Sequence, residues 1–181
     1  MTDHETEAIP TLPALKGLGR LADVRPVLVV DSREQQPLVF TRLEAIRGTL
    51  TSGDYSFSGG EQVFAVERKA INDLTGCCTG ERDRFERELH RLRGFQFARL
   101  LIVATPEAIR RHDYVSNISP KAVLNSLAAW EARFIPVVFA PTPADAARLV
   151  EAWAFWVARE IVEATNRLLR AQHENTEEPT P

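Results

Sequence analysis

The stretch from Gly53 to Leu74 has the sequence GDYSFSGGEQVFAVERKAINDL, and it decides the fold. Gly53-Asp54-Tyr55 begins one β-prone run, and the largely apolar residues 62–66 form a second. Ser-Gly-Gly-Glu at 58–61 predicts a turn between them. Together these segments predict a β-hairpin that brings Asp54 beside Glu67.

The acids and the lysine of this stretch have the spacing of a catalytic site. Side chains alternate along a strand, so Glu67 and Lys69 share one face and Arg68 lies on the other. Two carboxylates suit a hard cation such as Mg²⁺, which prefers oxygen ligands and retains several waters. Such a metal activates water and stabilises charge at phosphorus, while Lys69 would orient the water or neutralise negative charge. The pattern predicts a metal-dependent nuclease.

A third acid lies upstream, at the end of another predicted strand. Residues 27–30 are a continuous apolar run, typical of a buried strand, and Asp31-Ser32-Arg33-Glu34 follows it. Asp31 is the third candidate ligand, and Glu34 is a weaker fourth. Most isolated Glu-x-Lys pairs are solvated surface pairs, and Gly-Asp-Tyr alone also occurs in turns. The residues by themselves are therefore compatible both with a catalytic site and with ordinary surface residues.

The three motifs occur in the order found in a known family. Asp31-Ser32-Arg33-Glu34, then Gly53-Asp54-Tyr55, then Glu67-Arg68-Lys69 with Asp73 resemble the XPF/Mus81/Hef (ERCC4-type) nuclease domain family, over roughly Val27 to Val162. The resemblance implies an α/β fold with a restriction-endonuclease-like core, in which helices flank a central mixed β-sheet. It also implies a Mg²⁺ or Mn²⁺ cofactor and branched or flapped DNA as the substrate.

The resemblance assigns roles to individual residues. The metal ligands would be Asp31, Asp54 and Glu67, with Lys69 near the attacking water and Arg68 completing the catalytic signature. Supporting or DNA-binding roles would fall to Arg33, Glu34 and Asp73. The family's arginine after a glycine is offset here in Gly80-Glu81-Arg82, so Arg82 and Arg84 both remain candidates.

The chain departs from the family outside the nuclease motifs. No glycine follows Gly94, although helix-hairpin-helix modules need glycines, and no Walker-type loop indicates a helicase. We therefore expect a separate DNA-binding or helicase partner. The leading hypothesis is a structure-selective DNA endonuclease. The alternatives are a catalytically silent DNA-binding or scaffold subunit, and an enzyme acting on RNA or nucleotides.

Composition limits the class of protein. The 181 residues are 44 % hydrophobic with a net charge of −3, which predicts one soluble domain. No signal peptide or membrane span is recognisable, so we expect a cytoplasmic, DNA-associated protein without membrane contact. Residues 68–111 carry ten Lys/Arg against six Asp/Glu, a basic excess beside the predicted site. Adjacent Cys77 and Cys78 indicate reduced, structural thiols.

The remaining pattern predicts alternating helices and strands. Residues 38–45 and 48–51 are interpreted as connections. Helices are expected at 71–74, 81–93, from Pro106, at 119–133 and at 142–169, with strands at 99–104 and 135–140. The predicted domains are a flexible arm (1–25), the nuclease domain (26–170) and a disordered acidic tail (171–181).

The last predicted helix carries more apolar residues than one stripe needs, among them Trp153 and Trp156. Either both tryptophans belong to the core, or part of this helix contacts a partner. Because the resembling family commonly pairs its nuclease domains, we expect a homodimer.

Overall fold

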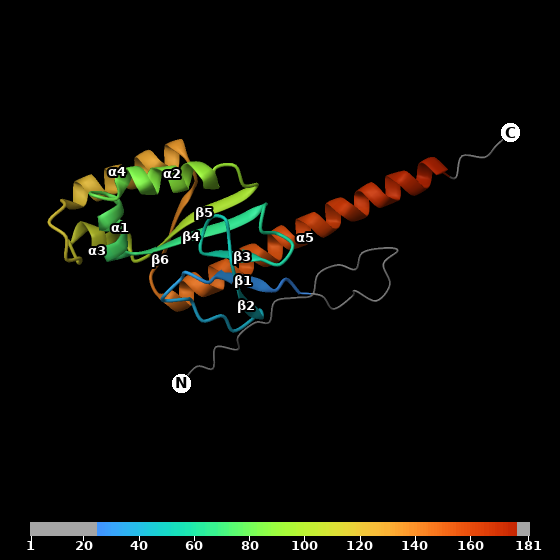
Figure 1. Ribbon diagram of the computed structural model, residues 1–181, viewed down its shortest axis with the longest axis horizontal. Coiled ribbons are helices and arrows are strands. Elements are labelled where there is room, and N and C mark those ends of the chain that lie inside the picture. The colour runs from blue at the N-terminus through green and yellow to red at the C-terminus, as the bar shows by residue number, and fades with distance from the viewer. Residues whose placement is uncertain (1–24, 177–181) are drawn as a thin grey trace.

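A mixed sheet of six strands forms the centre of the described part of the chain, residues 25–176 of a computed structural model (Figure 1). The strand order is β2-β1-β3-β4-β5-β6, and β3 runs opposite to the other five. The strands are β1 Leu28–Asp31, β2 Ala45–Gly48, β3 Tyr55–Phe57, β4 Phe64–Ala70, β5 Phe97–Val103 and β6 Val137–Ala140.

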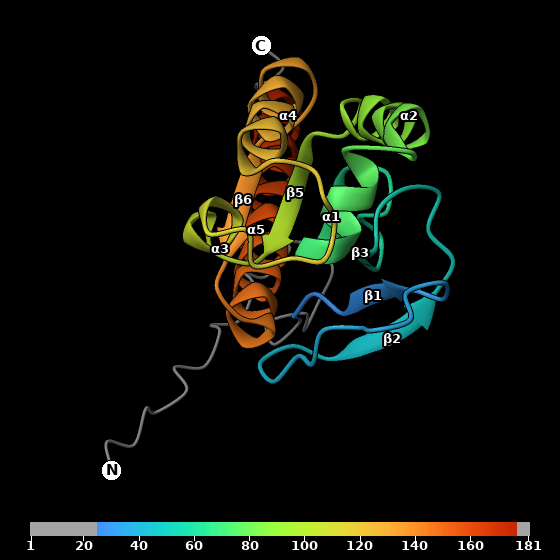
Figure 2. The ribbon, with the colours of Figure 1, turned by 90° about the vertical axis from the view of Figure 1, so that its left-hand side faces the viewer.

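Helices cover both faces of the sheet (Figure 2). The long helix α5 packs on one face, and the four shorter helices lie on the other. The helices are α1 Ile71–Cys77, α2 Arg82–Leu92, α3 Pro106–Arg110, α4 Pro120–Arg133 and α5 Pro143–Thr176. This arrangement confirms the predicted α/β class with a central mixed sheet flanked by helices.

The predicted hairpin is confirmed. β3 and β4 pair antiparallel with Tyr55 opposite Val66, and Gly60 N–H donates to Phe57 O at 2.9 Å within the turn. β4 begins at Phe64 and continues to Ala70, so Glu67 and Lys69 lie on the strand itself. Because β1 and β4 are parallel, Asp31 and Glu67 approach the same edge of the sheet.

Two elements differ from the sequence prediction. No strand was predicted between the connections at 38–45 and 48–51, yet residues 45–48 form β2 at the sheet edge. The residues of β2 are mostly exposed, so the segment lacks the apolar run that marks a buried strand. α5 extends to Thr176 instead of ending near Leu169, because Ala171 and Gln172 continue the helix without a breaker. The predicted arm lies outside the described residues apart from Arg25, and so does the tail beyond Thr176.

Two hydrophobic clusters hold the layers together. On one face, α5 packs Val150 and Ala154 against strand residues that include Phe64 and Leu101. On the other, the predicted stripe of Phe85, Leu89 and Leu92 is buried. The full burial of Trp130, from α4, completes this second cluster.

The two cysteines also belong to the second cluster. Cys77 and Cys78 are buried free thiols, as expected for structural cysteines. Burial raises the pKa of the Cys77 thiol to about 12, which keeps it protonated at neutral pH. Within residues 25–176, no helix combines the length and apolar character that a membrane crossing requires.

A buried carboxylate fastens the segment after β1 to α5. Glu151 is fully buried, and its Oε1 accepts hydrogen bonds from the backbone N–H groups of Thr41, Arg42 and Leu43 at 2.9, 2.6 and 3.1 Å. Leu43 is buried and Arg42 is half-buried, so water is a poor alternative partner for their N–H groups. Glu151 therefore fixes the segment that leads into β2.

Glu151→Ala should destabilise the fold by about 2–4 kcal/mol, because the backbone donors at 41–43 lose their acceptor. Glu151→Gln keeps an acceptor oxygen and should cost less. Chemical denaturation measures both. Glu160→Ala removes an exposed pair with Arg167 on the same helix and should stay within about 0.5 kcal/mol of wild type. A Glu151→Ala cost no larger than that of the control would contradict this role.

Candidate active site

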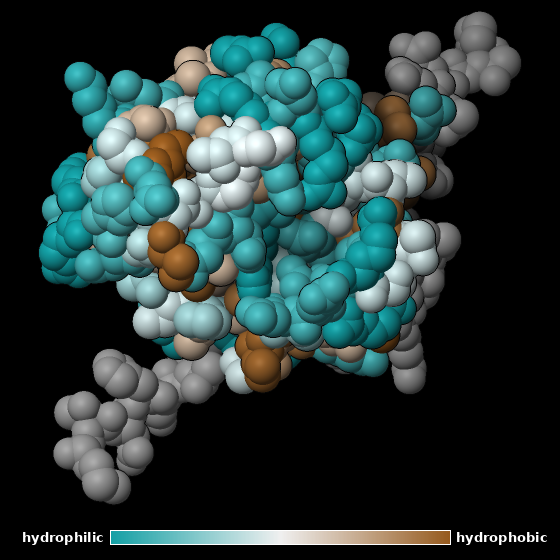
Figure 3. All heavy atoms as spheres, turned by 60° about the vertical axis from the view of Figure 1, so that its left-hand side comes forward, coloured by the Kyte–Doolittle hydropathy of each residue, from teal (hydrophilic) through white to brown (hydrophobic). Residues whose placement is uncertain are grey.

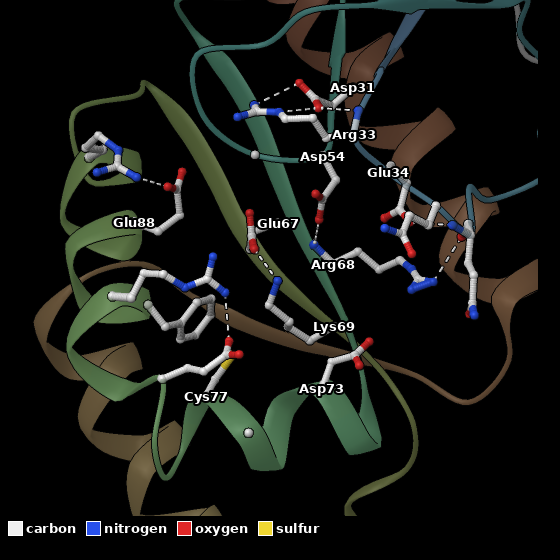
Figure 4. A pocket seen from close by; sticks show the side chains of 18 of the residues that line it. Asp31, Arg33, Glu34, Asp54, Glu67, Arg68, Lys69, Asp73, Cys77 and Glu88 are labelled. Carbon is white, nitrogen blue, oxygen red and sulfur yellow. Dashed lines mark hydrogen bonds and ion pairs between the residues drawn. The ribbon is translucent and has the colours of Figure 1, made fainter.

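A polar cleft of about 810 Å³ opens beside the carboxyl halves of β1 and β4, and α1 and α2 form its other wall (Figure 4). Polar side chains also surround a hollow near the middle of the face shown in Figure 3. The predicted site residues that line the cleft are Asp31, Arg33, Glu34, Asp54, Glu67, Arg68, Lys69, Asp73 and Arg84. The structure therefore brings almost the whole predicted set to one place.

A glycine allows Asp54 to approach β4. Gly53 has φ 78°, a left-handed conformation, and a Cβ there would lie 3.2 Å from Val66 O. The next residue is held on both sides: Asp54 N–H donates to Val66 O at 2.8 Å, and Arg68 N–H donates to Asp54 Oδ2 at 2.7 Å. The glycine thus avoids strain in the turn, and Asp54 ties the turn to β4 through two hydrogen bonds.

Glu67 and Lys69 share the cleft face of β4, as strand alternation predicted. Lys69 Nζ donates to Glu67 Oε1 at 2.5 Å, and their side chains are only 19 % and 8 % exposed, respectively. Lys69 Nζ also lies 5.2 Å from the ring centroid of Phe85 on α2. These contacts fix the ammonium group beside the acids.

The electrostatics show an excess of buried negative charge. Burial and, next in size, the neighbouring charge of Glu67 together raise the pKa of Asp54 to about 7, against the opposing effect of Lys69. Burial alone would lower the pKa of Lys69, but Glu67 and Asp54 outweigh it, and the net shift is upward. The single ammonium charge of Lys69 thus interacts with two carboxyl groups, those of Glu67 and Asp54.

This donor set fits a divalent cation. Asp54 and Glu67 offer hard carboxylate oxygens in a polar cleft, and burial together with the charge of Glu67 raises the pKa of Asp54. No group of three or more potential His, Cys, Asp or Glu ligands is gathered within residues 25–176.

Asp31 occupies a different environment from the other two acids. Its carboxylate pairs with Arg33, with Nε to Oδ1 at 2.7 Å, and it accepts the Leu50 N–H at 2.8 Å. The hydrogen bond from Arg33 lowers the pKa of Asp31 to about 2 despite the opposing effect of burial. In Figure 4 this acid faces the Arg33 side chain.

The other predicted residues take distinct positions. The Arg68 side chain extends away from Lys69, and its Nη2 donates to Gln36 O at 3.0 Å. Glu34 Oε1 accepts the Gln36 N–H at 2.7 Å. Asp73 lies on the cleft wall in the first turn of α1. These residues frame the site around the carboxylate pair.

The two candidate arginines after Gly80 point in different directions. Arg84 lines the cleft and pairs with Glu81 at 2.7 Å. Arg82 instead turns toward α4, where its Nη1 donates to Ser126 Oγ at 3.0 Å, and its Nε pairs with Glu86 at 3.0 Å. Of the two, Arg84 has the position for a role in the cleft.

Two further residues of α2 that line the cleft were not predicted as site residues. Glu88 and Arg91 also line the cleft and form an ion pair with each other. Arg84, Glu88 and Arg91 recur at i, i+4 and i+7, the spacing of one helical face. This polar stripe in the sequence could have indicated a cleft-lining face, but a polar stripe on a helix usually faces solvent.

Comparisons with known proteins agree with this geometry. The model of the ERCC4 domain family matches residues 30–152. Among solved structures, XPF from Aeropyrum pernix matches with a TM-score of 0.58 and 20 % identity, over 71 % of this chain and 60 % of that chain. XPF from Aeropyrum pernix in complex with DNA matches with a TM-score of 0.58 and 19 % identity, over 75 % of this chain and 66 % of that chain.

These matches define a shared fold. At such identities the likeness concerns the fold, and this chain spans less than two thirds of the length of either solved chain. None of the curated proteins matches the chain in sequence.

Asp54→Asn should raise the melting temperature in a metal chelator at pH 8, because it removes a carboxylate that the folded site disfavours. Folding raises the pKa of Asp54 from its ordinary value of 3.8 to about 7, so ionisation of Asp54 lowers the stability progressively as the pH rises between these values. At 1.36 kcal/mol per pH unit, the cost reaches at most about 4 kcal/mol. The advantage of the variant should therefore shrink as the pH falls to 5.

Calorimetry across this pH range, with and without Mg²⁺, provides the measurement. Mg²⁺ should stabilise the wild type and reduce the difference in melting temperature between it and Asp54→Asn. Asp83→Asn, which removes an exposed acid from α2, should give no such gain. A wild-type stability that rises from pH 5 to 8 relative to Asp54→Asn would contradict the account.

Proposed function

The chain belongs to the ERCC4 domain family, and on that premise we propose that it is a metal-dependent DNA endonuclease that hydrolyses phosphodiester bonds. The observation that carries the proposal is the meeting of Asp54, Glu67 and Lys69 in one polar cleft. Branched, flap or junction DNA is the proposed substrate, as the family resemblance implies. The XPF relative solved in complex with DNA supports DNA as the partner.

Asp54 and Glu67 would hold Mg²⁺ or Mn²⁺ in this proposal. When bound, the metal supplies an activated water and stabilises negative charge at the scissile phosphate. Lys69 has the charge and position to orient the attacking water or stabilise the developing charge. Phe85 packs beneath the ammonium group and limits its movement.

Arginines on both walls of the cleft would attract the DNA backbone. Arg33 lies beside β1, while Arg84 and Arg91 lie on α2. The Arg33 and Arg84 side chains are 70 % and 76 % exposed, so both are accessible to phosphates. Such contacts supply affinity that falls with salt and that carries little sequence information. A separate DNA-binding or helicase protein would then provide further selectivity.

The alternative is a catalytically silent DNA-binding or scaffold subunit. Degenerate partners of this kind typically lack the acids or the lysine. Here Asp54, Glu67 and Lys69 are all retained and gathered at one site. This feature favours the enzyme over the scaffold.

Asp54→Ala and Lys69→Ala should each reduce Mg²⁺-dependent cleavage at least about 100-fold while leaving the fold intact, because each removes a group that acts at the reacting phosphate. A panel of flap, junction, single-stranded and duplex DNA, with matched RNA flaps, measures the effect. Arg110→Ala, an exposed change on α3, should cleave like wild type.

Wild-type protein that cuts none of the panel with Mg²⁺ or Mn²⁺ would eliminate the endonuclease proposal. If it bound DNA without cleaving it, the scaffold alternative would gain support. Preferential cleavage of RNA flaps would reassign the substrate.

We further propose that the chain forms a homodimer through the exposed side of α5. Trp153 packs at 5.8 Å from the Phe97 ring centroid, whereas Trp156 is 60 % exposed. These rings and Val157 line a shallow apolar pocket of about 210 Å³. The two tryptophans therefore have different roles in this proposal. Trp153 packs against the core, and Trp156 provides exposed apolar surface for a partner.

Light scattering after size exclusion should give twice the 20.3 kDa chain mass at micromolar concentration. Trp156→Glu should shift the protein to monomer, because a charge would be buried in the apolar contact. Val115→Glu changes another exposed apolar residue, away from α5, and should remain dimeric. A wild-type monomer would contradict the dimer proposal.

A further inference from the structure

Asp31 has no oxygen left for a metal. Oδ1 accepts hydrogen bonds from Arg33 N at 2.8 Å and Arg33 Nε at 2.7 Å, while Oδ2 accepts from Arg33 Nη2 at 3.0 Å and Leu50 N at 2.8 Å. A carboxylate has about four acceptor positions, and these contacts use all of them. The side chain is 3 % exposed, so a metal would have to displace an existing donor.

The guanidinium group of Arg33 is hydrogen-bonded through Nε and Nη2, although the side chain is largely exposed. Its fork binds Asp31 through two side-chain nitrogens, and Nη2 also donates to Leu50 O at 2.8 Å. Such a bidentate pair fixes the plane of the guanidinium. Yet the Arg33 side chain is 70 % exposed at the cleft, and its Nη1 makes no hydrogen bond to any of residues 25–176.

Two further arginines brace the backbone around Arg33. Arg47 Nη1, from β2, donates to Asp31 O and Glu34 O, both at 2.9 Å. Arg68 Nη2, from β4, donates to Gln36 O at 3.0 Å. The segment that presents Arg33 is therefore anchored from two strands, as expected for a group whose position matters.

We infer that Asp31 is a positioning residue that holds Arg33 over the cleft to bind a substrate phosphate, and that it does not ligate the metal. This inference rests on the proposed function, because it names a phosphate contact of the same site. It assigns metal binding to Asp54 and Glu67 alone among the three predicted acids. Arg33 opposes Arg84 and Arg91 across the cleft, so the DNA backbone would be held from both walls.

Metal and DNA binding are measured separately, so that neither readout depends on cleavage. Loss of the free Mn²⁺ electron paramagnetic resonance signal reports metal binding without DNA. Fluorescence anisotropy of a labelled flap DNA in EDTA reports DNA affinity over a range of salt concentrations. The variants are Asp31→Asn, Arg33→Gln, Arg33→Lys and the Asp31→Asn/Arg33→Gln pair, with Asp54→Asn as the metal-ligand reference and Arg110→Gln as the surface control.

The expected result is that Asp31→Asn and Arg33→Gln each weaken DNA binding about 3- to 10-fold and reduce the salt slope by about one. The double variant should be no weaker than Arg33→Gln, because both changes remove the same contact. Arg33→Lys should recover only part of the affinity, since a lysine lacks the fork. Mn²⁺ binding should persist in all four and be lost in Asp54→Asn.

Asp31→Asn protein that binds Mn²⁺ as poorly as Asp54→Asn would overturn the inference. An unchanged DNA affinity of Arg33→Gln would also overturn the inference. This second result is conclusive even if the Asp31→Asn variant fails to fold. If wild type binds no DNA, the phosphate role is overturned as well. Cleavage separates the two proposals: in an active enzyme, Arg33→Gln should raise KM more than it lowers kcat, whereas an inactive wild type contradicts the proposed function itself.

Discussion

The contact between Asp54 and strand β4 is the constraint on which the site depends. Asp54 donates its backbone N–H to Val66 O and accepts the Arg68 N–H on its carboxylate, so both ends of the residue are tied to β4. Glycine at position 53 permits this close approach without strain, because φ is 78° there and a Cβ would lie 3.2 Å from Val66 O. The approach places one carboxylate beside Glu67, in an environment that disfavours two negative charges.

The surrounding cations divide the acids into two classes. Lys69 pairs with Glu67 and also interacts with the charge of Asp54, so one cation faces two carboxyl groups. Asp31 has its own arginine and two backbone donors, so its charge is already balanced. Acids that look alike in the sequence thus have opposite electrostatic conditions, with one pKa raised and the other lowered.

The sequence predicted the parts of the site that depend on local rules. Turn residues and strand alternation were sufficient to place Asp54 by β4 and Glu67 with Lys69. They did not reveal the environment of Asp31, because that depends on a loop returning to bring Leu50 N–H to its carboxylate. The α2 wall was missed for a related reason: a polar helical stripe has the same pattern whether it faces a cleft or solvent.

An anomalous difference map from a crystal soaked in Mn²⁺, recorded at the manganese absorption edge, tests the central claim most directly. We expect a peak bound by Asp54 and Glu67, with Asp31 still paired to Arg33. No peak at this pair, or a peak ligated by Asp31 with Arg33 displaced, would contradict this expectation.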